Sequence, residues 1–355
     1  MVITIIKIPG YLFGGWIGDF LNYKKIAIIL PIICGGMMLL CNLFIFNKVL
    51  VIVFLSLSKF MSGIASPSNV KIMDGLTNED NKKEVFAQAY MSTNIGMAIA
   101  SLSSGYLFSV SYSLVFIIDG LTRILSGLIL LFIHLNVIDD TVLEQQSNLH
   151  KNGIIAFLKK QNLCGYIFIT EIFIYIYSQY SYAIPLELNN LFEQHSENIY
   201  SMVLFVNCVT VIVSTPIMKN FSKKIDSLKC IQLSFVLILL GFCMYYFKLN
   251  IIAIIISTIL WSLGEVLFGI NELIYISQHT VKNYFARTVS IYDSLQNIII
   301  AIAPMINSFY ISKFSLKMSW LFIGMLSIMG AIYIWIFQKK SIWYLAERQK
   351  NDFNR

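Results

Sequence analysis

Ionisable side chains in the middle of long apolar segments are the groups in this sequence best able to carry chemistry. Lys59 lies about ten residues from each end of its segment, 49–70, too deep for its stem to reach water. A charge at the centre of a bilayer costs about 2.5–3.5 kcal/mol on insertion scales. Lys59 should therefore face an interior cavity, and we interpret it as a residue of substrate or proton coupling. Burial against one acidic partner for packing is the alternative.

A second group of such residues occupies the segment 250–276. Trp261, Glu265, Phe268 and Glu272 follow one another at intervals of four, three and four residues, which puts them on one face of a helix. A carboxyl removed from water can exchange a proton at working pH. We therefore interpret Glu265, near the centre, as a proton carrier, with a structural helix contact as the alternative. Glu272, nearer the end, is assigned to a gate.

A polar stripe marks the segment that begins near residue 162. Glu171, Tyr175, Ser178 and Tyr182 have helical spacing, and Gln179 flanks them. Surfaces that face lipid do not carry such stripes, so these residues are expected to line a central cavity. Tyrosine faces also suit cationic or aromatic ligands. Hydrogen bonding between helices is the alternative role.

Three more charged residues fall within apolar segments. Asp293 shares a face with Gln296 and Asn297 near one end of its segment, where it would contact substrate or cap a gate. Asp119 and Arg123 are four residues apart, so they can form an ion pair on one helix. Such a pair is either structural or part of a transport path.

The segments that hold these residues are long enough to cross a bilayer. The chain has 355 residues, of which 57% are hydrophobic and 13% are charged, about half the charge density of a soluble domain. Apolar stretches of about 20 residues recur along it, which predicts an all-α, multi-pass membrane protein. The eleven expected spans are 1–18, 26–46, 49–70, 86–109, 112–137, 162–185, 198–218, 228–247, 250–276, 286–311 and 317–338.

Lysine and arginine are concentrated in alternate connections. One set of connections contains Lys24, Lys25, Lys71, Lys82, Lys83, Lys151, Lys159, Lys160, Lys219, Lys223, Lys224, Lys229, Lys282 and Arg287. The opposite set has only four lysines and includes the acidic connection 186–198. The positive-inside rule puts the basic set on the cytoplasmic side of the membrane. A nucleic-acid-binding surface is excluded because the charge is spread along the chain.

The longest polar stretch divides the chain. Residues 138–161 form a cytoplasmic linker between an N-terminal bundle, 1–137, and a C-terminal bundle, 162–338, and residues 339–355 form a cytoplasmic tail. Two bundles of five and six helices suggest a transporter built from internal repeats. We find no nucleophile motif, metal-ligand spacing or phosphate loop, so we expect no enzyme activity, cofactor or metal. The expected partners are a small-molecule substrate, protons and the lipid bilayer, and the expected state is a monomer.

Several stretches resemble the major facilitator superfamily. GWIGDFLNYKK, 15–25, is similar to its signature G-x-L-A-D-R-x-G-R-K through Gly15, Asp19 and Lys24. KFMSG, 59–63, resembles the family's fourth-helix motif R-x-x-Q-G. WSLGE and YSQYSYAIPL, which begin at Trp261 and Tyr177, are similar to the tenth and seventh helices of bacterial drug antiporters.

A further stretch, GMAIASLSSG, 96–105, resembles the antiporter motif G-x-x-x-G-P-x-x-G-G. The residues concerned are Gly96, Ala100, Ser101, Ser104 and Gly105. Small residues let two helices approach closely, and in the antiporters this contact limits leak.

The resemblance implies a two-bundle transporter fold that starts at the second of twelve helices and so lacks the first. It implies that the turn after Gly15 is a cytoplasmic latch in which Asp19 holds the two halves together and Lys24 supports it. It also implies proton-coupled efflux of small amphipathic molecules or drugs by alternating access. The alternatives are an exporter of a specific metabolite (a siderophore-like compound, a peptide or a sugar derivative) and an inactive fragment that lacks the first helix.

Overall fold

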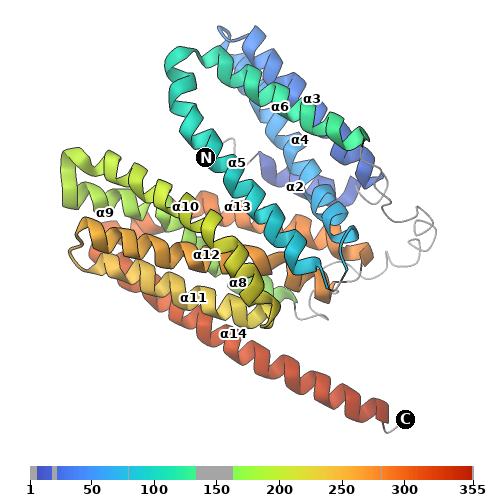
Figure 1. The fold of residues 1–355 in the computed structure, drawn as a ribbon, viewed down its shortest axis with the longest axis vertical. Coiled ribbons are helices and arrows are strands. Elements are labelled where there is room, and N and C mark those ends of the chain that lie inside the picture. The colour runs from blue at the N-terminus through green and yellow to red at the C-terminus, as the bar shows by residue number, and fades with distance from the viewer. Residues whose placement is uncertain (1–5, 18–21, 79, 133–162, 281, 354–355) are drawn as a thin grey trace. The chain divides into compact units, whose positions relative to one another are not determined.

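The computed structural model describes residues 6–17, 22–78, 80–132, 163–280 and 282–353, and these residues are helical with short connections (Figure 1). The helices of the first half are α2 (Lys7–Ile17), α3 (Tyr23–Leu43), α4 (Lys48–Gly75), α5 (Lys82–Val110) and α6 (Tyr112–Phe132). Those of the second half are α8 (Leu163–Tyr177), α9 (Ala183–Phe192), α10 (Ser196–Lys223), α11 (Ser227–Cys243), α12 (Ile251–His279), α13 (Lys282–Lys313) and α14 (Leu316–Phe353). Short 3₁₀ turns are η2 (Ser178–Ser181), η3 (Glu193–His195) and η4 (Met244–Tyr246).

Long apolar helices dominate the described residues, as the composition predicts. Eight helical segments among them are long and apolar enough to cross a membrane, and one of these, 163–223, contains α8, α9 and α10 in succession. The all-helical, membrane-spanning fold is therefore confirmed. Helices that span a membrane need about 20 residues, and α2 has only 11. The structure supports about eight long apolar helices, and the expected total of eleven is not confirmed.

The chain forms two compact units, and the boundaries between them fall within four helices, α5, α8, α12 and α13. Unit 1 contains residues 1–85, 96–164 and 276–301, and unit 2 contains residues 86–95, 165–275 and 302–355. Most of α5 belongs to unit 1, yet its residues 86–95 belong to unit 2. The first part of α13 belongs to unit 1 and the remainder to unit 2.

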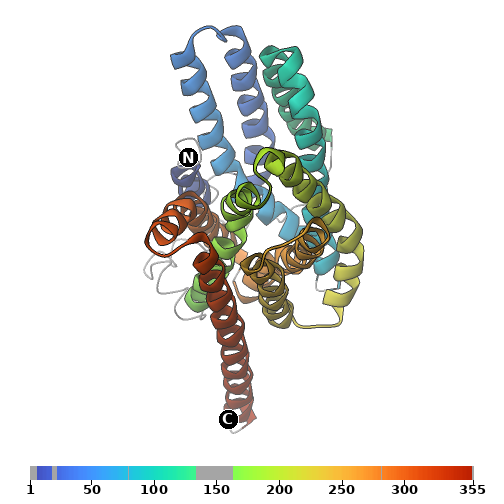
Figure 2. The ribbon, with the colours of Figure 1, turned by 90° about the vertical axis from the view of Figure 1, so that its left-hand side faces the viewer.

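Glycines allow the helices of unit 1 to pack closely. Figure 2 shows α3, α4 and α6 side by side, and α3 contacts both of the others. A Cβ atom added to Gly35 in α3 would lie 2.5 Å from the carbonyl oxygen of Gly120 in α6. Between α2 and α4, a Cβ added to Gly63 would lie 2.5 Å from the carbonyl oxygen of Lys7. Backbones at this distance leave room only for a hydrogen atom as side chain, which is the small-residue packing typical of membrane helices.

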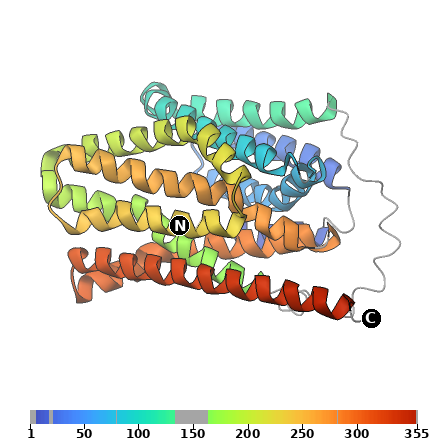
Figure 3. The same ribbon diagram turned by 60° about the horizontal axis from the view of Figure 1, so that its bottom comes forward.

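Aromatic rings fill the interior of unit 2. The ring of Phe173 stacks on that of Phe268 with centroids 3.9 Å apart. Trp320 stacks on Tyr245 at 4.9 Å, and both side chains are fully buried. Figure 3 shows α14 as a single continuous helix, which runs on from the expected span into the tail as far as Phe353. That continuation is consistent with a sequence that contains neither Gly nor Pro between 331 and 353.

The segment expected as one helix over 162–185 is broken, which corrects the predicted single stripe. It consists of α8, the 3₁₀ turn Ser178–Ser181 and the start of α9. A 3₁₀ turn has three residues per turn instead of 3.6, so Tyr182 no longer continues the face of Glu171 and Tyr175. Pro185 in the first turn of α9 has no backbone N–H to continue the hydrogen bonds of α8.

Two adjacent glycines of α3 test the packing of unit 1. We expect Gly35→Ala to destabilise the protein by about 1–3 kcal/mol, because the added methyl group meets the backbone of α6. Gly36→Ala should be neutral or stabilising by about 0.5–1 kcal/mol, since nothing lies within 4 Å of its Cβ position. Thermal unfolding of the purified protein in detergent measures both, and equal effects of the two substitutions would contradict this packing.

Candidate functional site

A buried carboxyl is the centre of a polar cluster in unit 2. Glu265 of α12 is 8% exposed. Its Oε2 accepts a hydrogen bond from Nδ2 of Asn207 on α10 at 2.7 Å. Its Oε1 accepts one from Oη of Tyr90 on α5 at 2.9 Å. Nδ2 of Asn207 also donates to Oγ of Ser262 at 2.9 Å. One carboxyl therefore joins three helices.

Aromatic side chains surround this carboxyl. Tyr177 and Tyr180 lie close enough to Glu265 to interact electrostatically with its carboxyl. Both rings contact the indole of Trp261, with centroids 6.1 and 6.0 Å away. Trp261 is fully buried, and its Nε1 has no hydrogen-bond partner among the described residues. The cluster therefore combines an acid, aromatic faces and an unused donor.

The donors around Glu265 are neutral, which determines its proton chemistry. Glu265 belongs to neither of the ion pairs found among the described residues, which join Lys82 with Asp74 and Arg123 with Asp119. A buried carboxylate without a cation is costly, and proton uptake removes that cost. The amide nitrogen of Asn207 can only donate, whereas the hydroxyl of Tyr90 can donate or accept. A proton on Oε1 is therefore compatible with both neighbours once the Tyr90 hydroxyl turns.

The predicted stripe on α8 also lies in the interior of unit 2. Glu171 and Tyr175 are each 7% exposed, and Gln179 is fully buried. Nε2 of Gln179 donates to the carbonyl oxygen of Tyr175 at 3.0 Å, and its Oε1 accepts from Nδ2 of Asn307 on α13 at 2.8 Å. Tyr182 is partly exposed. Oη of Tyr175 and Oδ1 of Asn307 have no hydrogen-bond partner in the part of the chain that the structure describes.

In unit 1, Asp293 lies on a face of α13 that contacts α2 and α4. Its Oδ2 accepts a hydrogen bond from Oγ of Ser66 on α4 at 2.7 Å. Ser290, one turn earlier, donates to the carbonyl oxygen of Tyr11 on α2. A Cβ added to Gly15 would lie 2.6 Å from Cβ of Ser290. Gly15 is therefore at a point of close approach between α2 and α13.

A second polar link of unit 1 joins the end of α4 and the start of α5 to the end of α12. Nζ of Lys82 lies 3.1 Å from Oδ1 of Asp74, and the two side chains are 11% and 15% exposed. Lys82 also donates to Oγ of Ser277 at 2.7 Å, and Ser277 donates to Asp74. These three groups form a closed triangle of hydrogen bonds.

Lys59, Asp119 and Arg123 lie close enough within unit 1 to interact electrostatically, and Lys7 of α2 interacts with both Arg123 and Asp293. Lys59 is partly buried on α4. Nε of Arg123 donates to both carboxylate oxygens of Asp119 at 3.0 Å, so these two residues form an ion pair on α6. Lys24 and Glu272 are partly exposed, and the backbone oxygen of Glu272 accepts from Oη of Tyr166 at 2.7 Å.

The predicted packing motif and latch are only partly covered by the structure. Gly96 and Ala100 are exposed on α5, and nothing lies within 4 Å of a Cβ added to Gly96. The side chains of Ser101 and Ser104, the surroundings of Gly105, and all of Asp19 lie outside the described residues.

Sequence reasoning missed the partners of the candidate residues. Asn207 and Asn307 are polar residues in apolar runs, a signal that could have identified them. Tyr90 carries no such signal, because tyrosine is common in this chain. From the sequence alone, Lys82 indicates only the orientation of the chain in the membrane, although its partner Asp74 lies eight residues earlier.

Comparison with known proteins places most of the chain in one family and one class of fold. The sequence profile described as Major Facilitator Superfamily matches residues 1–194 and 172–348. An uncharacterised MFS-type transporter of Bacillus subtilis, YttB, is 23% identical over 270 residues, which cover 74% of this chain and 65% of that relative.

Two solved structures are similar in fold. The human organic anion transporter MFSD10 superposes with a TM-score of 0.74 at 9% identity, over 94% of this chain and 82% of that one. The fucose:proton symporter FucP of E. coli superposes with a TM-score of 0.71 at 12% identity, over 94% of this chain and 90% of that one.

The triangle of Asp74, Lys82 and Ser277 can be tested by a double-mutant cycle. We expect Asp74→Asn and Lys82→Met to couple by about 0.5–3 kcal/mol in unfolding free energy, because each charge is removed from a partly buried partner. The matched control pairs Asp74→Asn with Lys229→Met, an exposed lysine of α11, and should be additive. Thermal unfolding in detergent measures both cycles, and additivity in the first would refute the link.

Proposed function

Because the chain belongs to the Major Facilitator Superfamily, a family of secondary transporters, we propose that it exports small amphipathic molecules in exchange for protons. The chain is a multi-pass membrane protein, and members of this family move small-molecule substrates across membranes. We also propose that a proton gradient drives this export and that the protein acts as a monomer in the bacterial cell membrane. The linker, 138–161, and the tail, 339–355, then lie in the cytoplasm.

The observation that carries the proposal is the environment of Glu265. Both of its oxygens accept hydrogen bonds from neutral donors, Tyr90 and Asn207, on two other helices. An acid inside a membrane protein that has no cationic partner among the described residues is suited to take up and release a proton. We assign proton carriage to Glu265 on this basis.

Proton uptake would act on the contact between α5 and α12. When Oε1 of Glu265 is charged, the Tyr90 hydroxyl donates to it. When Oε1 carries the proton, that hydroxyl must turn and accept, or the contact is lost. Since residues 86–95 belong to one compact unit and the rest of α5 to the other, a change at Tyr90 acts on a helix that both units share. This supports α5 as the element that couples protonation to alternating access.

The polar contacts of unit 1 support a gating role for its helix ends. The triangle of Asp74, Lys82 and Ser277 joins α4 and α5 to α12. Asp293 lies where α4 meets α13, and Gly15 lies where α2 meets α13. Hydrogen bonds between helix ends stabilise one conformation, and they break when another conformation becomes more favourable. We propose that they close one side of the transport path, together with Asp19, Lys24 and Glu272.

Aromatic side chains favour an amphipathic substrate. Trp261, Tyr177 and Tyr180 present rings beside a carboxyl, a combination that attracts organic cations. Lys59, Glu171 and Tyr182 are proposed as further residues of the cavity.

A second candidate is export of one specific polar metabolite. It is favoured by the polar side chains around the hydrogen bond between Asn307 and Gln179. The amide oxygen of Asn307 and the hydroxyl of Tyr175 are buried there and have no hydrogen-bond partner among the described residues. A specific substrate with matching hydroxyl or amide groups would satisfy both.

Transport in proteoliposomes tests the role of Glu265. With a pH gradient and ethidium as the amphipathic cation, wild-type protein should accumulate the dye, and Glu265→Gln should lower gradient-driven flux at least about tenfold. Passive ethidium exchange should persist, because Gln keeps the shape of the site and removes only the exchangeable proton.

The control for this experiment is Glu197→Gln, an exposed glutamate of α10, which should transport like wild type. Gradient-driven flux that is unchanged in Glu265→Gln at every pH would remove Glu265 from the mechanism. Absence of ethidium flux in wild type, with flux of a polar metabolite instead, would favour the second candidate.

A further inference from the structure

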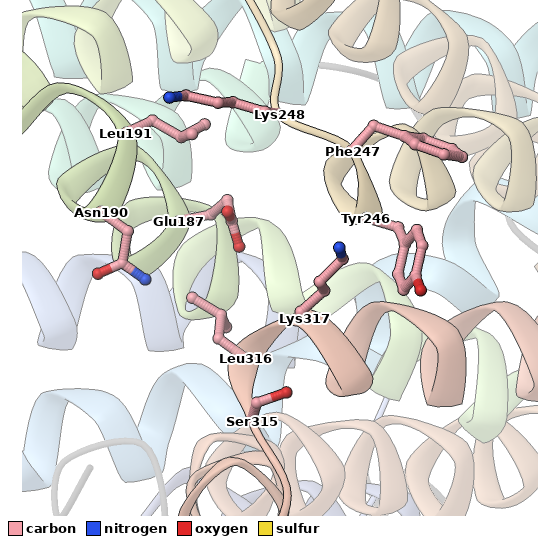
Figure 4. Close-up of a pocket in the computed structure, with 9 residues that line it drawn as sticks. All are labelled: Glu187, Asn190, Leu191, Tyr246, Phe247, Lys248, Ser315, Leu316 and Lys317. Carbon is pink, nitrogen blue, oxygen red and sulfur yellow. The ribbon is translucent and has the colours of Figure 1, made fainter.

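A pocket of about 340 Å³ lies in unit 2, away from Glu265, where several helices end. Its walls come from α9, from the connection between η4 and α12, and from the start of α14 (Figure 4). The volume is at the lower end of the range of small-molecule sites, about 300–1,000 Å³. Its polar lining includes Glu187, Asn190, Lys248 and Lys317.

The carboxylate in this pocket is held in a fixed position. Oε2 of Glu187 accepts a hydrogen bond from Nε1 of Trp320 at 2.9 Å. Trp320 is fully buried, and its ring stacks on Tyr245. A long acidic side chain on a surface usually samples many rotamers, so the hydrogen bond from a buried indole keeps the Glu187 carboxylate in one place beside the pocket.

The opposite charge faces the same space. Nζ of Lys317 lies 4.6 Å above the ring of Tyr246. Figure 4 shows the Lys317 ammonium and the Glu187 carboxylate directed into the pocket. The two groups are not within 4.0 Å of each other, since neither belongs to an ion pair found among the described residues. A cation and an anion that face one pocket without pairing leave room for a ligand that carries both charges.

The residues around the pocket are typical of lipid headgroup depth. Tyrosine and tryptophan gather at the membrane interface, and lysines near helix ends extend toward it. Tyr246 ends η4 and Lys317 is the second residue of α14, so both lie at helix ends. A ligand in this pocket can therefore come from the water or from the membrane.

We propose that this pocket binds a zwitterion in which an ammonium group lies close to a phosphate or carboxylate. The ammonium group contacts Glu187, and the anionic group contacts Lys317 and Lys248. Both a phosphatidylethanolamine headgroup and a free small zwitterion have this chemistry. The site is independent of the proposed proton carrier.

Binding of soluble headgroups to the purified full chain in detergent, measured by calorimetry, tests the charge pairing. Wild type should bind glycerophosphoethanolamine more tightly than glycerol 3-phosphate, which lacks the ammonium group. Glu187→Gln keeps an oxygen for Trp320 and should weaken only the zwitterion, by about fivefold. Lys317→Gln should weaken both ligands by a similar factor.

The matched control is Lys313→Gln, an exposed lysine four residues earlier that does not line the pocket, and it should change neither affinity. Thermal unfolding of each variant verifies that it is folded. Equal affinity of wild type for the two ligands, or equal behaviour of Lys317→Gln and Lys313→Gln, would overturn the proposal.

Native mass spectrometry distinguishes the two sources of the ligand. Retention of dioleoylphosphatidylethanolamine by wild type, and its loss in Glu187→Gln, identifies a lipid headgroup. Binding of glycerophosphoethanolamine without lipid retention identifies a free zwitterion, and binding of neither overturns the site. Glu265→Gln should bind like wild type, so failure of the transport proposal leaves this result unchanged.

Discussion

The hydrogen bonds to the buried carboxyl of Glu265 are the interaction on which the proposed mechanism depends. A carboxylate that is removed from water and not paired with a cation must be held by dipoles, and Tyr90 and Asn207 supply them from α5 and α10. Protonation reverses the role of one oxygen from acceptor to donor. In the proposed mechanism, a change of a single proton alters how three helices are held, and this local event couples an ion to a larger motion.

The surrounding structure makes that event consequential because it is closely packed. Glycines such as Gly35 and Gly63 bring helix backbones into contact in unit 1, and stacked rings such as Phe173 and Phe268 fill unit 2. Packed interiors of this kind change between discrete arrangements rather than deforming gradually. In the proposed mechanism, the triangle around Lys82 is one contact that such a change makes or breaks.

Local patterns in the sequence were enough to predict the helices and the depth of single residues. Apolar runs of helical length identified the membrane-spanning class, and the rarity of charge in them led to Glu265 and Glu171, which are both buried. Contacts between distant segments could not be predicted, because nothing in Tyr90 or Asn207 alone indicates that they meet Glu265. The 3₁₀ turn at Ser178–Ser181 was missed for a related reason: helical spacing continues through it, and only Pro185 signals the break.

The most direct test of the central claim is to observe the proton on Glu265 itself. Infrared difference spectroscopy of the protein in lipid, recorded while pH is changed across the working range, detects the C=O stretch of a protonated carboxyl. The account predicts a band that appears with acid, shifts in D₂O, is absent in Glu265→Gln and changes frequency in Tyr90→Phe. A spectrum that is the same for wild type and Glu265→Gln would contradict it, because Glu265 would then hold one charge state throughout.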